Sequence, residues 1–94
     1  MDDILEIDDP GDGRLVLSGV MTQQNLAALV AALASAKPRE IDLAAVTFID
    51  SAGLGALLSS GVGSGGPRVV NADPHVRRIF EVMGLADLFG PTER

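Results

Sequence analysis

The chain of 94 residues contains no cysteine, tryptophan or tyrosine, and it has a single histidine, His75. The absence of cysteine excludes disulfides, thiolate metal ligands and cysteine nucleophiles, and it suits a reducing cytoplasm. A lone histidine does not supply a zinc ligand set, and nothing in the sequence places it beside a serine nucleophile. We therefore expect a protein that is not an enzyme and that needs no metal or other cofactor.

Basic residues are also scarce. Lys and Arg number 7 against 13 Asp and Glu, which gives a formal net charge of −6 at pH 7. Proteins that bind nucleic acids neutralise phosphates with Lys and Arg, so direct nucleic-acid binding is not expected. An acidic surface suits solubility and a basic protein partner instead.

Long apolar runs are missing as well. No run approaches the roughly 20 residues that a membrane span requires. The sequence begins with the acidic Met1-Asp2-Asp3, which is unlike the basic start of a secretory signal. We therefore expect a cytoplasmic protein without membrane insertion.

The residues that are present favour one aliphatic core. Hydrophobic residues make up 47% of the chain and aromatic residues only 3%, all of them Phe. A chain of this length can bury a core without staples, so residues 1–94 are expected to form a single domain.

Short strands and helices alternate along the sequence, as hydrophobic periodicity and turn residues indicate. Asp73-Pro74 is a strong helix start, and Gly84 is a suitable helix end. These patterns predict an α/β protein with a small mixed sheet of about four strands, packed with three to four helices.

The expected strands are Ile4–Ile7, Arg14–Ser18, Glu40–Leu43 and Arg68–Asn71, the first two forming an antiparallel hairpin. The expected helices are one capped by Thr22 with apolar positions Leu26, Leu29, Val30 and Leu33, one from Ala52 to about Ser60, and one with buried positions Val76, Ile79, Phe80 and Met83. Leu88-Phe89 is expected to pack onto the core.

The most informative segment is Val46–Gly55. An apolar, β-branched run ends in Asp50-Ser51, and small residues and leucines follow at helical spacing, which predicts a strand, a tight turn and a helix that begins near Ser51. A serine at the start of a helix lies near unpaired backbone N–H groups and in the positive field of the helix dipole, which is a favourable place for a phosphate. The alternative is that Ser51 is only a helix N-cap.

Three other patterns have simpler interpretations. Gly61–Gly66 matches the dinucleotide pattern G-x-G-x-x-G, but it follows an expected helix and precedes a strand, so it predicts a loop. His75 falls on the polar side of the last helix and is expected to be exposed. The cluster Asp8, Asp9 and Asp12 favours local hydrogen bonds in a turn, because the ligand spacing of a calcium loop is absent.

The sequence resembles the STAS domain family, which includes the anti-sigma factor antagonists. The resemblance rests on Ile41-Asp42-Leu43, Val46–Leu58, Val69-Val70-Asn71, Val76–Phe80 and Met83–Phe89, and it covers nearly the whole chain. The family often has Glu-Leu-Asp after the glycine that corresponds to Gly19, whereas this chain has Val20-Met21-Thr22. Thr22 keeps the capping role and removes the acidic character.

This resemblance implies a regulatory protein that switches partners. In such antagonists the serine after the Asp, here Ser51, is phosphorylated by a kinase that is itself the anti-sigma factor. The unmodified form binds that anti-sigma factor and the phosphorylated form releases it, with a phosphatase as a further expected partner. The partner-binding residues expected on this basis are Asp50, Ser51, Ala52, Gly53, Leu54 and Thr22.

The family implies two alternative functions. STAS domains also serve as accessory subunits of an ABC-type lipid transporter, although those commonly carry Thr at the position of Ser51. They also act as scaffolds in other signalling complexes.

Overall fold

The computed structural model describes residues 4–62 and 65–85. The strands are β1 (Leu5–Asp8), β2 (Arg14–Met21), β3 (Glu40–Ile49) and β4 (Arg68–Val70). The helices are the 3-10 turn η1 (Gln23–Asn25), followed by α1 (Leu26–Ala36), α2 (Ser51–Ser59) and α3 (Pro74–Val82). The predicted α/β class is confirmed, with a four-stranded mixed sheet and three α-helices.

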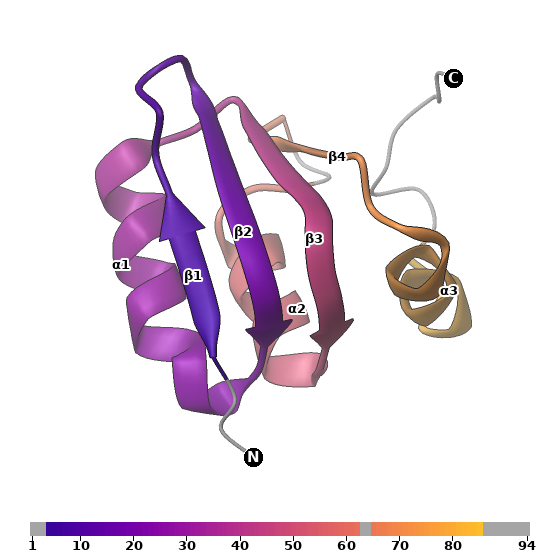
Figure 1. The fold of residues 1–94 in the computed structure, drawn as a ribbon. Helices are drawn as coiled ribbons and strands as arrows, with labels where there is room; N and C mark the ends of the chain where they lie inside the picture. The colour runs from indigo at the N-terminus through magenta and orange to yellow at the C-terminus, as the bar shows by residue number, and fades with distance from the viewer. Residues whose placement is uncertain (1–3, 63–64, 86–94) are drawn as a thin grey trace.

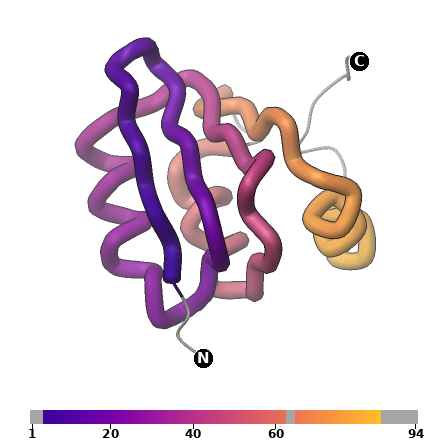
Figure 2. The backbone as a smooth tube through the Cα atoms, viewed as in Figure 1, coloured from indigo at the N-terminus to yellow at the C-terminus, as the bar shows by residue number. Residues whose placement is uncertain are grey.

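The four strands lie in the order β1-β2-β3-β4. β1 and β2 form the predicted antiparallel hairpin, whereas β2–β3 and β3–β4 are parallel. Because parallel neighbours need a crossover, α1 and α2 connect these strands and cover one face of the sheet (Figure 1). β4 pairs only with Glu40–Asp42 of β3, and α3 packs beside β3 beyond the end of β4 (Figure 2).

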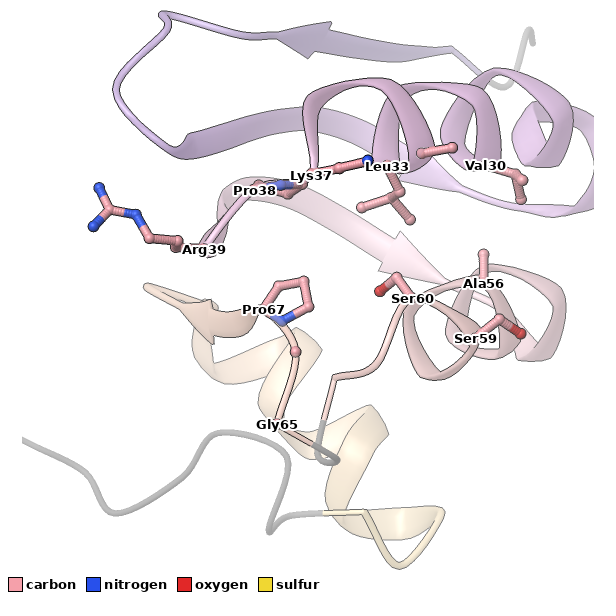
Figure 3. Close-up of a pocket in the computed structure, with 12 residues that line it drawn as sticks. Val30, Leu33, Lys37, Pro38, Arg39, Ala56, Ser59, Ser60, Gly65 and Pro67 are labelled. Atoms are coloured by element: carbon pink, nitrogen blue, oxygen red, sulfur yellow. The ribbon is translucent and has the colours of Figure 1, made fainter.

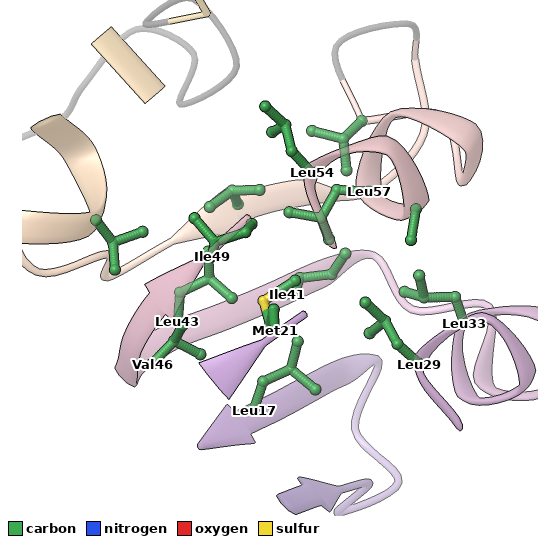
Figure 4. Packing of buried hydrophobic residues seen from close by; sticks show 14 of the residues in the cluster. Leu17, Met21, Leu29, Leu33, Ile41, Leu43, Val46, Ile49, Leu54 and Leu57 are labelled. Atoms are coloured by element: carbon green, nitrogen blue, oxygen red, sulfur yellow. The ribbon is translucent and has the colours of Figure 1, made fainter. Parts of the chain in front are cut away.

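The core lies between the sheet and the helices and is aliphatic, as predicted. Figure 4 shows strand residues such as Leu17 and Ile41 facing Leu29 of α1 and Leu57 of α2. Phe80 of α3 is its largest fully buried side chain. Packing of this kind requires an apolar inner face on each helix, which the sequence periodicity supplies.

Two expected core positions are wrong. Val30 is 48% exposed and Met83 is 44% exposed. Val30 turns outward because α1 is apolar on more than one side, so periodicity does not separate its inner and outer faces. Met83 lies just past the end of α3, where Gly84 takes the left-handed backbone (φ 76°) that was predicted for it. The expected packing of Leu88-Phe89 lies outside the described residues.

The helices differ in charge. α1 and α2 contain no charged residue, whereas α3 carries Arg77, Arg78 and Glu81. No helix within residues 4–62 and 65–85 is long and apolar enough to cross a membrane.

Candidate functional site

Asp50 holds together the turn between β3 and α2. Its Oδ1 accepts a hydrogen bond from the Gly53 N–H at 2.9 Å, which makes it the N-cap of α2. Its Oδ2 accepts from the Gln23 N–H at 3.1 Å, and its own N–H donates to the Met21 carbonyl at 3.0 Å. One residue therefore joins the start of α2 to the end of β2 and the start of η1.

Gly53 allows α2 to lie directly against the end of β2. A Cβ atom at this position would be 2.5 Å from the Met21 carbonyl oxygen, which is closer than any side chain tolerates. A glycine is required here by the close approach of two backbones. The neighbouring Gly55 has open space where its Cβ would be, so it is under no such constraint.

Ser51 is the first residue of α2, and its side chain is exposed. The interpretation of Ser51 as the N-cap is wrong, because Asp50 has that role. Within the described part of the chain, the Ser51 hydroxyl has no hydrogen-bond partner. The N–H groups of Ser51 and Ala52 lie in the first turn, where a helix offers them no carbonyl acceptor. The hydroxyl thus stands free beside two amide donors at the positive end of the helix.

Thr22 lies next to this turn but is only 8% exposed. Its Oγ1 accepts a hydrogen bond from the Gln24 N–H at 3.3 Å, so it caps η1, the turn that leads into α1. α1 itself begins after Asn25, whose side chain donates instead to the Val20 carbonyl at 2.8 Å. The predicted cap is present one turn earlier than expected.

Burial divides the expected partner-binding residues into two groups. Ser51 is exposed, and Asp50 and Ala52 are half-buried. Gly53 and Leu54 are buried, Leu54 with 3% of its surface exposed, so they support the turn and offer a partner no side-chain surface in this structure.

Sequence reasoning missed the exposed side chains near the ends of β2 and β3. Phe48 is 45% exposed and pairs in register with Val20 on the sheet face away from α1 and α2, and Gln23 and Gln24 are exposed. The available signal was strand alternation, because Ile49 is a core residue and its neighbour must point to the other face. Within residues 20–25 and 46–54, the only charged side chain is that of Asp50.

The remaining motifs do not form a competing site. The described residues of Gly61–Gly66 lie between α2 and β4, where the Gly66 N–H donates to the Gly61 carbonyl at 2.9 Å, and Gly63-Ser64 lies outside the described residues. His75 is exposed, and Asp9 and Asp12 accept bonds from nearby backbone N–H groups. Among the residues that the structure describes, no group of three or more His, Cys, Asp or Glu side chains could hold a metal ion.

A second polar cluster has a structural role. The Asp42 carboxylate, which is largely buried, accepts hydrogen bonds from the Ala44 N–H at 2.9 Å and the Asn71 side chain at 3.0 Å. It also forms an ion pair with Arg14 at 3.5 Å. The cluster ties the end of β4 to β2 and β3, at the end of the sheet opposite Ser51.

A family model described as "Mlab, STAS domain" matches residues 6–90. The chain therefore belongs to the STAS domain family. Within that family it is similar to an anti-sigma factor antagonist from Mycobacterium paratuberculosis, with 30% identity and a TM-score of 0.70 over 98% of this chain and 90% of the other.

Two further structures support the fold. The anti-sigma factor antagonist SpoIIAA in its unphosphorylated form has 20% identity and a TM-score of 0.64, over 90% of this chain and 84% of the other. The phosphorylated form of SpoIIAA, a cell fate determinant of Bacillus, has 20% identity and a TM-score of 0.53, over 90% and 87%. None of the curated proteins matches the sequence.

Proposed function

We propose that this protein is an anti-sigma factor antagonist that switches partners when Ser51 is phosphorylated. In this proposal the unmodified protein binds an anti-sigma factor that is also a serine kinase, and a phosphatase restores the unmodified form. The observation that carries the proposal is the free, exposed Ser51 hydroxyl at the first position of α2. The similarity to antagonists that include a phosphorylated form supports it.

The turn can accept a phosphate without changing the fold. The helix dipole and the first-turn amides stabilise a negative charge at this position, which offsets repulsion from the Asp50 carboxylate. Phosphate adds about −1.5 to −2 charges to a turn, residues 46–54, whose only other charge is that of Asp50. The effect would therefore fall on the contact with the partner.

The segments around Ser51 contain no cation that would neutralise a phosphate on this residue. Residues 20–36 and 43–67 contain no Lys or Arg. No cation within these segments could pair with the phosphate, so the phosphate would present its charge to a tightly fitting partner surface. The half-exposed Phe48, which lies two residues before Asp50 near the end of β3, would be a further part of that surface.

Phosphorylation by the kinase captured from host lysate tests the site. Intact-mass spectrometry after incubation with ATP should show one added phosphate on the natural chain and none on Ser51→Ala. Ser59→Ala is the matched control and should still gain one phosphate, because Ser59 lies at the other end of α2. A phosphate on Ser59, Ser60 or Ser64 in the natural chain would contradict the proposal.

Affinity capture with the purified chain tests the partner. We expect the natural chain to retain a serine-kinase-like anti-sigma factor, and Ser51→Asp to retain much less of it. Capture of an ABC ATPase would support the transporter subunit instead, and capture of other STAS proteins would support a scaffold.

A further inference from the structure

A second site lies at the opposite end of α2 from Ser51. A cavity of about 580 Å³, which is open to solvent on one side, lies between the C-terminal ends of α1 and α2 and the segment that precedes β4 (Figure 3). Its volume falls within the range of about 300–1,000 Å³ that is typical of small-molecule sites. Along the axis of α2, its lining residues Ala56 and Ser59 are about 7.5 and 12 Å from Ser51, and none of its lining residues is among those proposed for the switch surface.

The walls of the cavity are apolar. Val30 and Leu33 of α1 face Ala56 of α2, and the two buried prolines Pro38 and Pro67 form a rigid end. Val30 keeps 48% of its surface exposed at the opening. An apolar side chain at the mouth of an apolar cavity favours a ligand with a hydrocarbon body.

Lys37 places a positive charge at this cavity. It ends α1 in the left-handed conformation, with φ 45° and ψ 56°, where glycine is the usual residue. Such a conformation is strained for a residue with a side chain, and strain of this kind gathers at functional sites. Figure 3 shows the Lys37 amine beside Leu33, whereas Arg39 extends away from the cavity. The Arg39 guanidinium donates to the Asp12 carbonyl at 3.2 Å.

The charge of Lys37 is not compensated within the described residues. None of the residues that line the cavity is acidic, and Lys37 has no ion-pair partner among residues 4–62 and 65–85. Lys37 is exposed and has no carboxylate beside it at the cavity. In a protein of net charge −6, such a lysine favours an anionic ligand over a cationic one. On the α2 side of the cavity, the Ser59 and Ser60 hydroxyls add two polar groups to the lining.

We propose that this cavity binds a small amphiphile with a single hydrocarbon chain and an anionic head group, such as a medium-chain carboxylate. The chain would lie between Val30, Leu33 and Ala56, and the head group would pair with the Lys37 ammonium. Charge complementarity selects this occupant over a neutral or cationic amphiphile, because a charge-assisted hydrogen bond requires the anion.

Calorimetric titration of the full chain with three probes of equal chain length tests the head group. The probes are decanoate, 1-decanol and decyltrimethylammonium, each kept below the concentration at which it forms micelles. We expect saturable binding of decanoate with one ligand per chain, at least about tenfold tighter than either other probe. Equal affinity for all three probes, or no saturable binding of decanoate, would overturn the proposal.

Variants of the cavity test its location. Lys37→Gly removes the charge and suits the left-handed conformation, so the protein should remain folded while decanoate binds about tenfold more weakly. Ala34→Phe, which fills the cavity mouth, should weaken decanoate and decanol alike. Arg78→Ala, an exposed change on α3, is the matched charge control and should bind decanoate as the natural chain does.

Two further results would overturn the proposal that this cavity binds the amphiphile. Undiminished decanoate binding by Lys37→Gly would show that the anion is held elsewhere. A concentration-dependent dimer, seen by sedimentation and abolished by Ala34→Phe, would mean that a second copy of the chain covers this face. Neither result depends on phosphorylation of Ser51, so this proposal and the proposed function can fail separately.

Discussion

Helices α2 and α3 both begin after an aspartate that caps the helix, and the two caps have the same local geometry. Asp50 Oδ1 accepts from the Gly53 N–H at 2.9 Å, and Asp73 Oδ1 accepts from the Val76 N–H at 2.9 Å. The second carboxylate oxygen differs between them. That of Asp50 also accepts from the Gln23 N–H, whereas no bond beyond the cap is seen for Asp73 within the described residues.

The residues after each cap differ in the same way. α3 continues with Pro74, which fixes the helix start and offers no hydroxyl, and it buries Val76 completely. α2 continues with an exposed serine and has glycine at the third position, where the end of β2 lies too close for a side chain. A cap alone starts a helix. A cap that is also tied to a neighbouring strand holds an exposed hydroxyl in a fixed place.

The largest effect should come from changing the third position of α2. Gly53→Ala would force a Cβ atom against the Met21 carbonyl, and we expect it to lower the free energy of unfolding by about 3 kcal/mol, the upper end of overpacking effects. Gly55→Ala is the matched control, because its Cβ would meet open space, and it should raise stability by about 0.5–1 kcal/mol. Chemical denaturation measures both. Equal effects of the two changes would mean that β2 and α2 do not approach closely.

The two caps should differ in strength. Asp50→Ala removes the cap and the bond to Gln23, so we expect a loss of about 2 kcal/mol, against about 1 kcal/mol for Asp73→Ala. The measurement is the denaturation midpoint at a constant denaturant slope. If Asp73→Ala proves as costly as Asp50→Ala, the tertiary bond of Asp50 contributes nothing measurable, and the contrast between the helices is only local.

The smallest effect should be that of Ser51→Ala. The side chain is exposed and makes no hydrogen bond within the described residues, so the free energy of unfolding should change by no more than about 0.5 kcal/mol. Thermal unfolding of the purified variant measures this. A loss above 1 kcal/mol, as an order of magnitude for a lost cap, would show that Ser51 is a structural residue after all.

Local signals predicted the beginnings of both helices and the hairpin, because a cap, a proline or a turn depends on residues close in sequence. The full length of β3 was not predicted. The strand expected over Glu40–Leu43 and the strand expected to end before Asp50 are one strand, which runs from Glu40 to Ile49. Alternation fails there because the pairing with β2 shifts between Val16 and Ser18, so exposed Ala44 and Ala45 interrupt the buried positions.

The candidate site was predicted in part. Asp50-Ser51 could be located from the sequence, because an apolar strand followed by small residues marks the turn. The bond from the Gln23 N–H to Asp50 and the exposure of Phe48 depend on how β2 and β3 align, which no local pattern contains. The cavity beside Lys37 could not be predicted for the same reason, because its walls are formed by segments that are distant in sequence.

The two oxygens of the Asp50 carboxylate accept hydrogen bonds from two different segments, so these segments should separate together when the turn opens. The amides of Gln23 and Gly53 belong to different crossover connections, yet both donate to the same side chain. Hydrogen exchange of either amide requires its bond to break, and a rotation of Asp50 away from the turn breaks both bonds at once. The two amides should then exchange with deuterium at matched rates, faster than the core strands, and both should lose protection together in Asp50→Ala. The exchange rate of these two amides would measure how often the turn that carries Ser51 separates from the end of β2.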